Sequence, residues 1–385
     1  MPLNGITILD LTRLLPFGYG SLLLADMGAK VIKIEQPYKG DYMRGIPPLN
    51  RKESHVFLSS NRNKKSVTLD LKKMEGKEVF FRLAKNADVI FESFRPGIAK
   101  KLGIDYEAMQ KISPGLIYCS CTGYGQTGPY SQRVGHDINY LGVSGILSFT
   151  GRHTGAPVIP GVPIADMTSG LCSALAISAA LVGRRKSQEG RYIDISMTDC
   201  MVSYMHIHAS ALFGKMKEKF PITGGNIRYE TFQTKDGKYL TFGNVEDKFW
   251  LNFCDLIGRE DLKKFNFEES GKQDVIMEQI KALFQEKTRE EWLTLMEGKD
   301  ICYGPVNELD EIFDDPQIKH RGLYFELKHP VEGKIGQIGL PIKFSKQSQT
   351  VQYPPPRLGE HTDEILKQLG YTVDEITRLR KLAII

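Results

Sequence analysis

Three titratable residues of this chain of 385 residues occupy positions from which they could do chemistry. His136 lies between a glycine-rich loop and an apolar run; its imidazole could accept a proton, although a single histidine is more often structural. Asp166 directly precedes an apolar helical run, which is typical of a helix N-cap, and a helix start would keep its carboxylate ionised as a base or nucleophile. Glu246 precedes another helical run, and by itself it indicates only a helix-start carboxylate.

The glycine-rich loop before His136 reads Gly123-Tyr-Gly-Gln-Thr-Gly128. It fits the G-x-G-x-x-G string of dinucleotide sites, in which a helix follows the glycines and holds the pyrophosphate. Here Pro129 follows at once and residues 131–135 are typical of a loop, so no helix N-terminus is available. We therefore interpret the segment as a flexible loop beside a ligand.

The elements that must position these residues alternate between strand and helix in the first part of the chain. Apolar runs bounded by turn residues predict strands at 6–11, 31–35, 66–71, 88–92, 116–121 and 192–196. Helical periodicity predicts helices at 19–27, 73–86, 106–112 and 166–185. This order is typical of an α/β fold with an open, doubly wound parallel sheet.

The pattern changes further along the chain. Residues 229–245 are typical of a β-hairpin, with Asp236-Gly237 at its turn. Helical runs follow at 247–257, 273–284 and 289–297. We therefore expect a large α/β domain over 1–224, completed by 326–385, and a smaller α+β domain over 225–325.

Composition excludes several classes of protein. Hydrophobic residues make up 41% and charged residues 25%, which is typical of a folded globular chain. The net charge of +5 is spread along the sequence, which favours a pocket for an anionic small molecule over a nucleic-acid partner. Six cysteines without a CxxC pair predict reduced thiols and no metal site. The apolar run 171–182 is too short to span a membrane, so we expect a buried helix in a cytoplasmic protein.

Several short strings of residues occur in a recognisable order along the chain. They are LADMGA at 24–29 followed by VIKIEQP, LDLK at 69–72, DVIFESFRPG at 88–97, GHDINY at 135–140, Asp166, Gly224-Gly225 and LGEH at 358–361. Together they resemble the family III CoA transferases and, within that superfamily, the alpha-methylacyl-CoA racemases. The resemblance implies an open, Rossmann-like large domain with a smaller second domain. It also implies two copies of the chain threaded into an interlocked homodimer, and CoA as part of the substrate with no tightly bound cofactor.

Two activities follow from the resemblance. In the racemases, the positions matching His136 and Glu246 act on one face of the substrate α-carbon, and the position matching Asp166 acts on the other. Epimerisation needs acid/base groups on both faces, because one proton leaves as another arrives opposite. In the transferases the aspartate is instead a nucleophile that becomes covalently joined to the acyl group and then to CoA.

The resemblance also implies a set of CoA contacts. They comprise Leu69, Asp70, Leu71, Lys72, Ser93 and Lys101, with Gly135, Asp137, Ile138, Asn139 and Tyr140 near the thioester. A basic residue that is usual in the family is Gln36 here, and Lys33 or Lys39 is a possible replacement.

His136, Glu246 and Gly224-Gly225 before the hairpin favour the racemase, so the primary prediction is an epimerase of 2-methyl-branched acyl-CoA thioesters. The run Met167-Thr-Ser-Gly170 is closer to the transferases. A CoA transferase that moves CoA between carboxylic acids is therefore the alternative, and a CoA-ester binder without catalysis is a third hypothesis.

Overall fold

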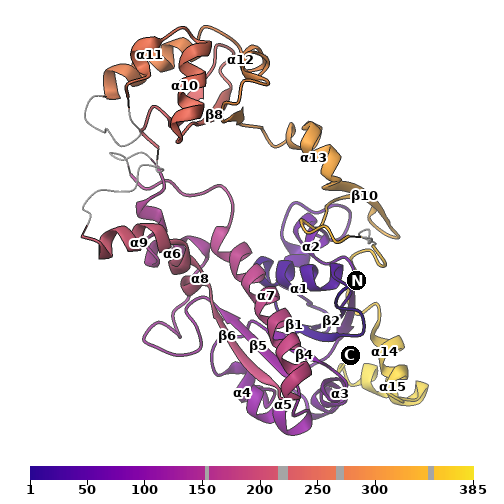
Figure 1. The fold of residues 1–385 in the computed structure, drawn as a ribbon. Coiled ribbons are helices and arrows are strands. Elements are labelled where there is room, and N and C mark those ends of the chain that lie inside the picture. The colour runs from indigo at the N-terminus through magenta and orange to yellow at the C-terminus, as the bar shows by residue number, and fades with distance from the viewer. Residues whose placement is uncertain (152–155, 216–223, 266–272, 346–350) are drawn as a thin grey trace. The chain divides into compact units, whose positions relative to one another are not determined.

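The computed structural model describes residues 1–151, 156–215, 224–265, 273–345 and 351–385. The chain forms two compact units, each of which is described by itself (Figure 1). The larger unit combines residues 1–144, 161–204 and 317–385, and the smaller unit combines residues 145–160 and 205–316. Each unit is thus built from segments that are distant in the sequence. The division into domains at 1–224 with 326–385, and at 225–325, stays a prediction.

A six-stranded sheet organises the larger unit. Its strands are β1 (Thr7–Leu11), β2 (Lys30–Glu35), β3 (Lys64–Thr68), β4 (Val89–Glu92), β5 (Ile117–Thr122) and β6 (Arg191–Ser196). Their spatial order is β3-β2-β1-β4-β5-β6, and every neighbouring pair is parallel. The predicted α/β fold with an open, doubly wound parallel sheet is therefore confirmed.

The two faces of this sheet are covered by different helices. Leu9 and Leu11 point into an apolar cluster with α3 (Met74–Lys85), α5 (Tyr106–Ile112), α14 (Thr362–Gln368) and α15 (Val373–Lys381). Alternate residues point the other way, toward α1 (Leu15–Asp26) and α7 (Ile164–Ser187), which also pack on each other. The C-terminal helices thus complete the core of the first strands.

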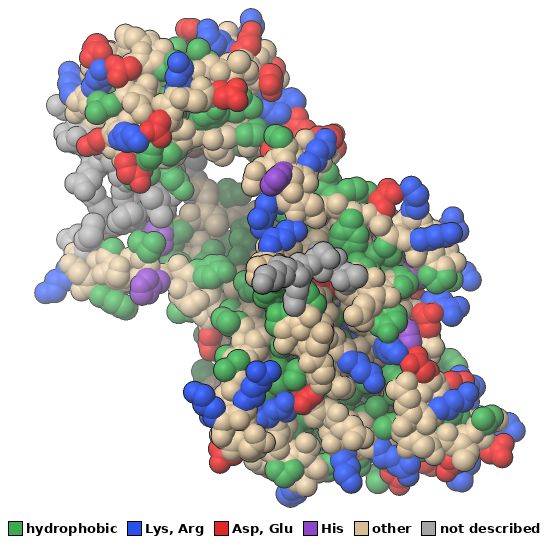
Figure 2. Space-filling view, turned by 45° about the vertical axis from the view of Figure 1, so that its right-hand side comes forward, with side chains coloured by type: hydrophobic (Ala, Val, Ile, Leu, Met, Phe, Trp, Pro, Cys, Tyr) green, Lys and Arg blue, Asp and Glu red, His purple; other side chains and the backbone are tan. Residues whose placement is uncertain are grey.

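The remaining elements of the larger unit are short. The helical ones are η1 (Tyr42–Gly45), α2 (His55–Ser60), α4 (Ile98–Leu102), α6 (Asp137–Val143), α8 (Met197–Tyr204) and α13 (Pro316–Arg321). An antiparallel hairpin joins β10 (Tyr324–His329) to β11 (Gly333–Ile338). On the face drawn in Figure 2, Lys and Arg are interspersed with Asp and Glu rather than gathered into one stripe.

A buried ion pair connects this hairpin to the first helix. The Arg62 guanidinium lies 2.5 Å from the Asp26 carboxylate at the end of α1, and both side chains are almost completely buried. Arg62 also donates to the side-chain oxygen of Gln337 on β11, at 3.1 Å. Asn63 adds a hydrogen bond to Asp26 at 2.8 Å. The C-terminal segment is therefore held to the N-terminal half by charge as well as by apolar packing.

Helix α7 is longer than the apolar run inside it. By length and composition it passes the test for a membrane-spanning helix, and half of the tested stretch is buried against the protein. This is weak evidence for a membrane span, and the prediction that the apolar run 171–182 is too short to span is not contradicted by it. Its burial against α1 and β5 agrees with the predicted packing role, because a core helix has the same length and composition.

The smaller unit holds a three-stranded antiparallel sheet. Its strands are β7 (Tyr229–Gln233), β8 (Tyr239–Gly243) and β9 (Tyr303–Pro305). The helices are α9 (His206–Phe213), α10 (Asp247–Leu256), α11 (Gln273–Phe284) and α12 (Arg289–Met296). Phe232, Leu240 and Phe242 pack on Trp250 and Phe284 in one buried aromatic core. The hairpin predicted at 229–245 is confirmed, with Gly237 at a φ of +76° in its turn.

Candidate active site

The carboxyl ends of the parallel strands border two hollows in the larger unit. The order of the sheet reverses between β1 and β4, and ligands of open α/β sheets bind at such a point. The first hollow, of about 580 Å³, is lined by residues that end or follow β1, β4, β5 and β6: Leu14, Ser93, Arg95, Pro96, Cys121, Thr122, Gly123, Tyr124 and Met197. Its other wall comes from Asp166 and from residues 131, 133–136, 139 and 140.

Asp166 is the carboxyl group in the wall of the first hollow. It lies in the first turn of α7, whose N-cap is Pro163, so the predicted N-cap role is wrong. Its backbone N–H donates to Oδ1 of Asp137 at 3.0 Å. Among the described residues, none donates a hydrogen bond to its carboxylate oxygens. Burial, and then the negative charge of Asp137, raise the pKa of Asp166 to about 7, which is opposite in direction to the effect expected from a helix start.

His136 begins helix α6 at the rim of the same hollow. It is exposed, and its backbone N–H donates to the side-chain oxygen of Asn139 at 2.9 Å. His136 and Asn139 line the hollow beside Asp166, as do Gly135 and Tyr140. Asp137 lies behind this wall and Ile138 is exposed outside it. Of the five predicted thioester contacts, Gly135, Asn139 and Tyr140 line the hollow. Asp137 bonds to Asp166 in its wall, and Ile138 is not part of the lining.

Packing against Tyr140, rather than dinucleotide binding, explains the glycine at position 123 of the glycine-rich loop. A side chain at Gly123 would overlap the ring of Tyr140, whose hydroxyl donates to the carbonyl of Gly135 at 2.7 Å. The close approach of backbone to ring therefore requires glycine at this position. The Thr122 hydroxyl is buried beside it and has no hydrogen-bond partner in the described structure.

The second hollow, of about 70 Å³, lies at the ends of β1, β2 and β3. Leu69, Asp70, Leu71 and Lys72 line it, together with Leu11, Arg13, Ile34, Glu35, Gln36, Phe94 and Leu102. Four of the predicted CoA contacts are thus side by side. Lys101 is on exposed α4 and lines neither hollow.

Lys33 is not available as the replacement phosphate contact. Its side chain is fully buried, with the ammonium 2.9 Å from Asp41 and donating to the carbonyl of Thr12 at 2.9 Å. That hypothesis is therefore wrong for Lys33, because a buried and paired ammonium cannot reach a phosphate in solvent. Lys39 is exposed and remains possible.

A turn after β4 separates the two hollows. Ser93 lines the first and Phe94 lines the second. The carboxyl group of Glu92, which is 2% exposed, accepts the backbone N–H of Phe94 at 2.6 Å and the hydroxyl of Ser120. Ser93 accepts the N–H of Arg13 at 3.1 Å. The turn is thereby bonded to Arg13, which follows β1, and to Ser120 on β5, and it divides the two hollows.

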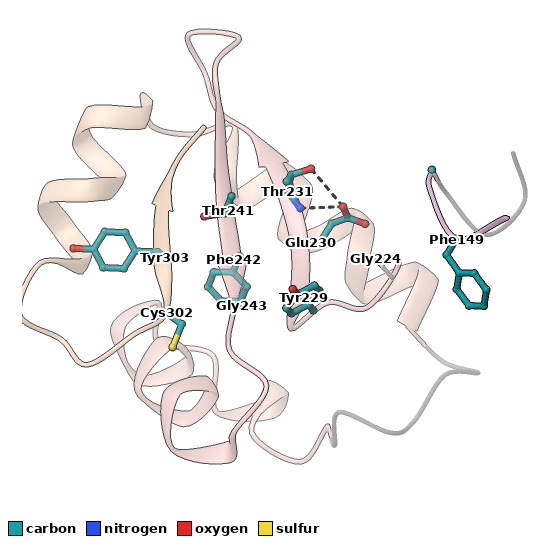
Figure 3. A pocket seen from close by; sticks show the side chains of 11 residues that line it. Phe149, Gly224, Tyr229, Glu230, Thr231, Thr241, Phe242, Gly243, Cys302 and Tyr303 are labelled. Atoms are coloured by element: carbon teal, nitrogen blue, oxygen red, sulfur yellow. Dashed lines mark hydrogen bonds between the residues drawn. The ribbon is translucent and has the colours of Figure 1, made fainter. Parts of the chain in front are cut away.

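A pocket of about 680 Å³ lies in the smaller unit (Figure 3). Tyr229, Thr231 and Thr241 line it from the face of the sheet opposite the aromatic core. The Glu230 carboxylate accepts the N–H groups of Gly225 and Thr231, each at 2.9 Å. Gly225 and its neighbour Gly224 both have positive φ, of +77° and +82°. These bonds hold the glycine turn against the start of β7.

Glu246 also belongs to the smaller unit. It is the exposed residue that precedes α10, as predicted for a helix-start carboxylate. His136 and Asp166 are in the larger unit, so the three predicted acid/base residues are divided between the two units. Only His136 and Asp166 line a common hollow.

The comparison with known proteins identifies the family. A family model described as CoA-transferase family III matches residues 3–362. The succinyl-CoA:glutarate CoA-transferase of Homo sapiens is 38% identical, over 96% of this chain and 86% of that protein. The alpha-methylacyl-CoA racemase of Homo sapiens is 31% identical, over 100% of this chain and 98% of that protein. A crystal structure of a CAIB/BAIF family protein from Brucella suis matches with a TM-score of 0.83 and 32% identity, covering 96% of this chain and 99% of that chain. The chain is therefore an enzyme of the family III CoA-transferase superfamily.

Proposed function

We propose that this enzyme transfers CoA from an acyl-CoA thioester to a carboxylic acid, with Asp166 as the nucleophile. The observation that carries the proposal is the Asp166 carboxyl group, which borders the first hollow and whose oxygens accept no hydrogen bond from the part of the chain that the structure describes. Similarity supports transfer over the epimerisation predicted first, because the transferase relative is 38% identical and the racemase relative 31%.

The proposed reaction passes through acyl and CoA forms of Asp166. The carboxylate attacks the thioester carbonyl carbon, the C–S bond breaks, and a mixed anhydride and CoA thiolate form. The thiolate attacks the aspartyl carbonyl, which releases the first acid and leaves CoA joined to Asp166 as a thioester. The acceptor carboxylate then attacks this thioester, and the thiolate released attacks the acyl carbon of the new anhydride. The products are the new acyl-CoA and the original Asp166 carboxylate.

CoA binding is proposed for the edge of the sheet that carries both hollows. The nucleotide end would lie near residues 69–72 and the thioester near Asp166, with the turn at Ser93 between them. The exposed Lys72 and Lys101 would supply positive charge to the phosphates.

The partner proposed for the enzyme is a second copy of its own chain. Leu171, Leu175 and Val182 are exposed on α7, at 47%, 68% and 64%, and their spacing places them on one side of the helix. An apolar stripe of this kind is usually covered by another surface. The interlocked arrangement and the cytoplasmic location both stay predictions.

Epimerisation remains the second candidate because His136 and Glu246 match the racemase positions. One assay separates the two activities. A chiral 2-methylacyl-CoA is incubated with the enzyme in heavy water, with and without a carboxylic acid. We expect a new acyl-CoA only when the acid is present, and no loss of optical purity. Uptake of α-deuterium well above the buffer control, without an added acid, would contradict the transferase proposal.

The rate of transfer should depend on pH through Asp166. The ionised carboxylate is the nucleophile, and its pKa is raised to about 7. We therefore expect kcat/KM to fall about tenfold per pH unit below 7 and to level off above it. Asp137→Asn removes the neighbouring negative charge and keeps an oxygen for the Asp166 N–H, so the acidic limb should move to lower pH.

Asp194→Asn is the matched control for this pH profile. Asp194 also accepts a backbone N–H, that of Gln126 at 3.0 Å, but it does not contribute to the raised pKa of Asp166. In Asp194→Asn, kcat/KM should fall over the same pH range as in the unmodified enzyme. A limb that stays in place in Asp137→Asn would show that Asp166 does not control the profile.

A further inference from the structure

Two guanidinium groups line the hollow that contains Asp166. They belong to Arg95 and Arg133, and both side chains are exposed. No carboxylate of the described residues forms an ion pair with either. Ionised groups in a hollow without a protein partner are available to an anionic part of the ligand. Neither arginine was singled out from the sequence, where each is one basic residue among 51.

Arg133 differs from Arg95 in how it is held. Its guanidinium carbon lies 3.5 Å from the centroid of the Tyr130 ring. Tyr130 contacts Tyr124 edge to face at 5.7 Å, and Tyr124 contacts Tyr140 in the same way at 5.2 Å. Tyr140 is buried, and its hydroxyl is bonded to the carbonyl of Gly135. A row of three aromatic rings thus connects the guanidinium to the fixed wall of the hollow.

The other end of this row lies beside the nucleophile. Burial, followed by the negative charge of Asp166, raises the pKa of Tyr140 to about 12. Tyr140 and Asp166 also line the same hollow, so the row runs from the neighbourhood of Asp166 to Arg133. A guanidinium that stacks on a ring keeps the N–H groups at its edge free, and it loses little conformational entropy when it binds a carboxylate with two hydrogen bonds.

In the proposed reaction, neither the reacting carboxylate nor the CoA phosphates would pair with Arg133. The carboxylate that reacts with Asp166 becomes part of a neutral anhydride or thioester. The phosphates of CoA are proposed to lie at the second hollow, which has its own basic residues, Arg13 and Lys72. A dicarboxylic acyl group, in contrast, keeps one ionised carboxylate throughout the reaction.

We infer that Arg133, stacked on Tyr130, binds the distal carboxylate of the substrate, so that the enzyme transfers CoA between dicarboxylic acids. This inference rests on the proposed transferase function and adds the class of its substrate. Arg133 determines specificity in this scheme and takes no part in the bond-making steps.

The test compares two acceptors of five carbons that differ only at the far end, glutarate and pentanoate, with one acyl-CoA donor. The unmodified enzyme should prefer glutarate. In Arg133→Gln, kcat/KM for glutarate should fall roughly 10- to 100-fold, mainly through KM, because charge-assisted hydrogen bonds are lost. The value for pentanoate should stay the same. Arg133→Lys should recover only part of the preference, because an ammonium lacks the planar fork.

Variants of the ring and of the second arginine provide the controls. Tyr130→Phe keeps the stacking surface and should keep the preference for glutarate, whereas Tyr130→Leu should lower it. Arg95→Gln removes an equal charge from the same hollow and should leave the ratio of the two acids unchanged.

The outcomes distinguish this inference from the proposed function. Equal losses for glutarate and pentanoate in Arg133→Gln would mean that Arg133 binds CoA or supports the fold, and would overturn the inference. An unmodified enzyme that uses both acids equally well would overturn it too, while the transferase function stands. If the enzyme transfers CoA to neither acid, the proposed function itself is contradicted, and the inference with it.

Discussion

Asp166→Asn should abolish CoA transfer, lowering kcat/KM on the order of 10⁴-fold or more. The amide has nearly the same size as the carboxylate but is not a nucleophile, so neither the anhydride nor the CoA thioester can form. Steady-state transfer measures the loss. Intact-protein mass after an acid quench should show CoA on the unmodified enzyme and none on Asp166→Asn. Hydroxylamine should release this CoA, because it cleaves thioesters.

Glu246→Gln is the informative companion to Asp166→Asn. Transfer requires only the carboxylate of Asp166, so the Glu246 variant should keep its covalent CoA and most of its activity. Epimerisation would instead need both groups, and both variants would lose it. A CoA adduct that persists in Asp166→Asn would assign the nucleophile to another residue.

Arg62→Met should lower the free energy of unfolding by about 3–5 kcal/mol, the usual cost of leaving one buried charge unpaired. The change leaves the Asp26 carboxylate without its guanidinium and removes the hydrogen bond to Gln337. Methionine fills much of the volume, so the loss of charge rather than a cavity should dominate. Denaturation by urea, followed by circular dichroism, measures the difference, because the parallel sheet and most of the helices belong to the larger unit that contains Arg62.

A surface pair supplies the control for this stability prediction. Arg380 pairs with Asp363 between α15 and α14, and both side chains are 54% exposed. Arg380→Met should cost less than about 1 kcal/mol, because water solvates the remaining carboxylate. Adding Asp26→Asn to Arg62→Met should recover part of the lost stability. Equal effects of Arg62→Met and Arg380→Met would contradict the role assigned to burial.

The order of elements could be read from the sequence, but some of their limits could not. The predicted strand at 66–71 is β3 at Lys64–Thr68 instead. The start of β3 at Lys64 was not predicted, because a lysine rarely lies inside a core. Here the Lys64 side chain is fully buried and bonded to Gly18, Ser21 and Asn61. Residues 69–72 leave the sheet and line the second hollow. A pattern of apolar residues cannot distinguish a strand from an apolar turn that follows it.

Short and irregular strands escaped prediction for a related reason. β9 has three residues, Tyr303–Pro305, and two of them are glycine and proline, which disfavour strands. It forms only because the edge of β8 is available to pair with it. The β10–β11 hairpin was also missed. Its burial alternates along both strands, but the residue types do not follow it: Tyr324 and Ile338 are exposed, while His329 and Gln337 are buried. The period of two is therefore hard to see in the sequence.

The sequence by itself determined the family and the parallel sheet, because these follow from local patterns and from strings of residues. It also indicated several of the residues that border the two hollows, among them His136, Asp166 and residues 69–72. Only the tertiary structure decided what those residues can do. Asp166 was expected to be held ionised by a helix start, but burial and the approach of Asp137 raise its pKa to about 7. Arg133 is positioned by the Tyr130 ring beneath its guanidinium, and Tyr130 in turn packs edge to face on Tyr124. Charges and contacts between segments distant in the chain have no signature in any one segment, and they appear only when the chain is folded.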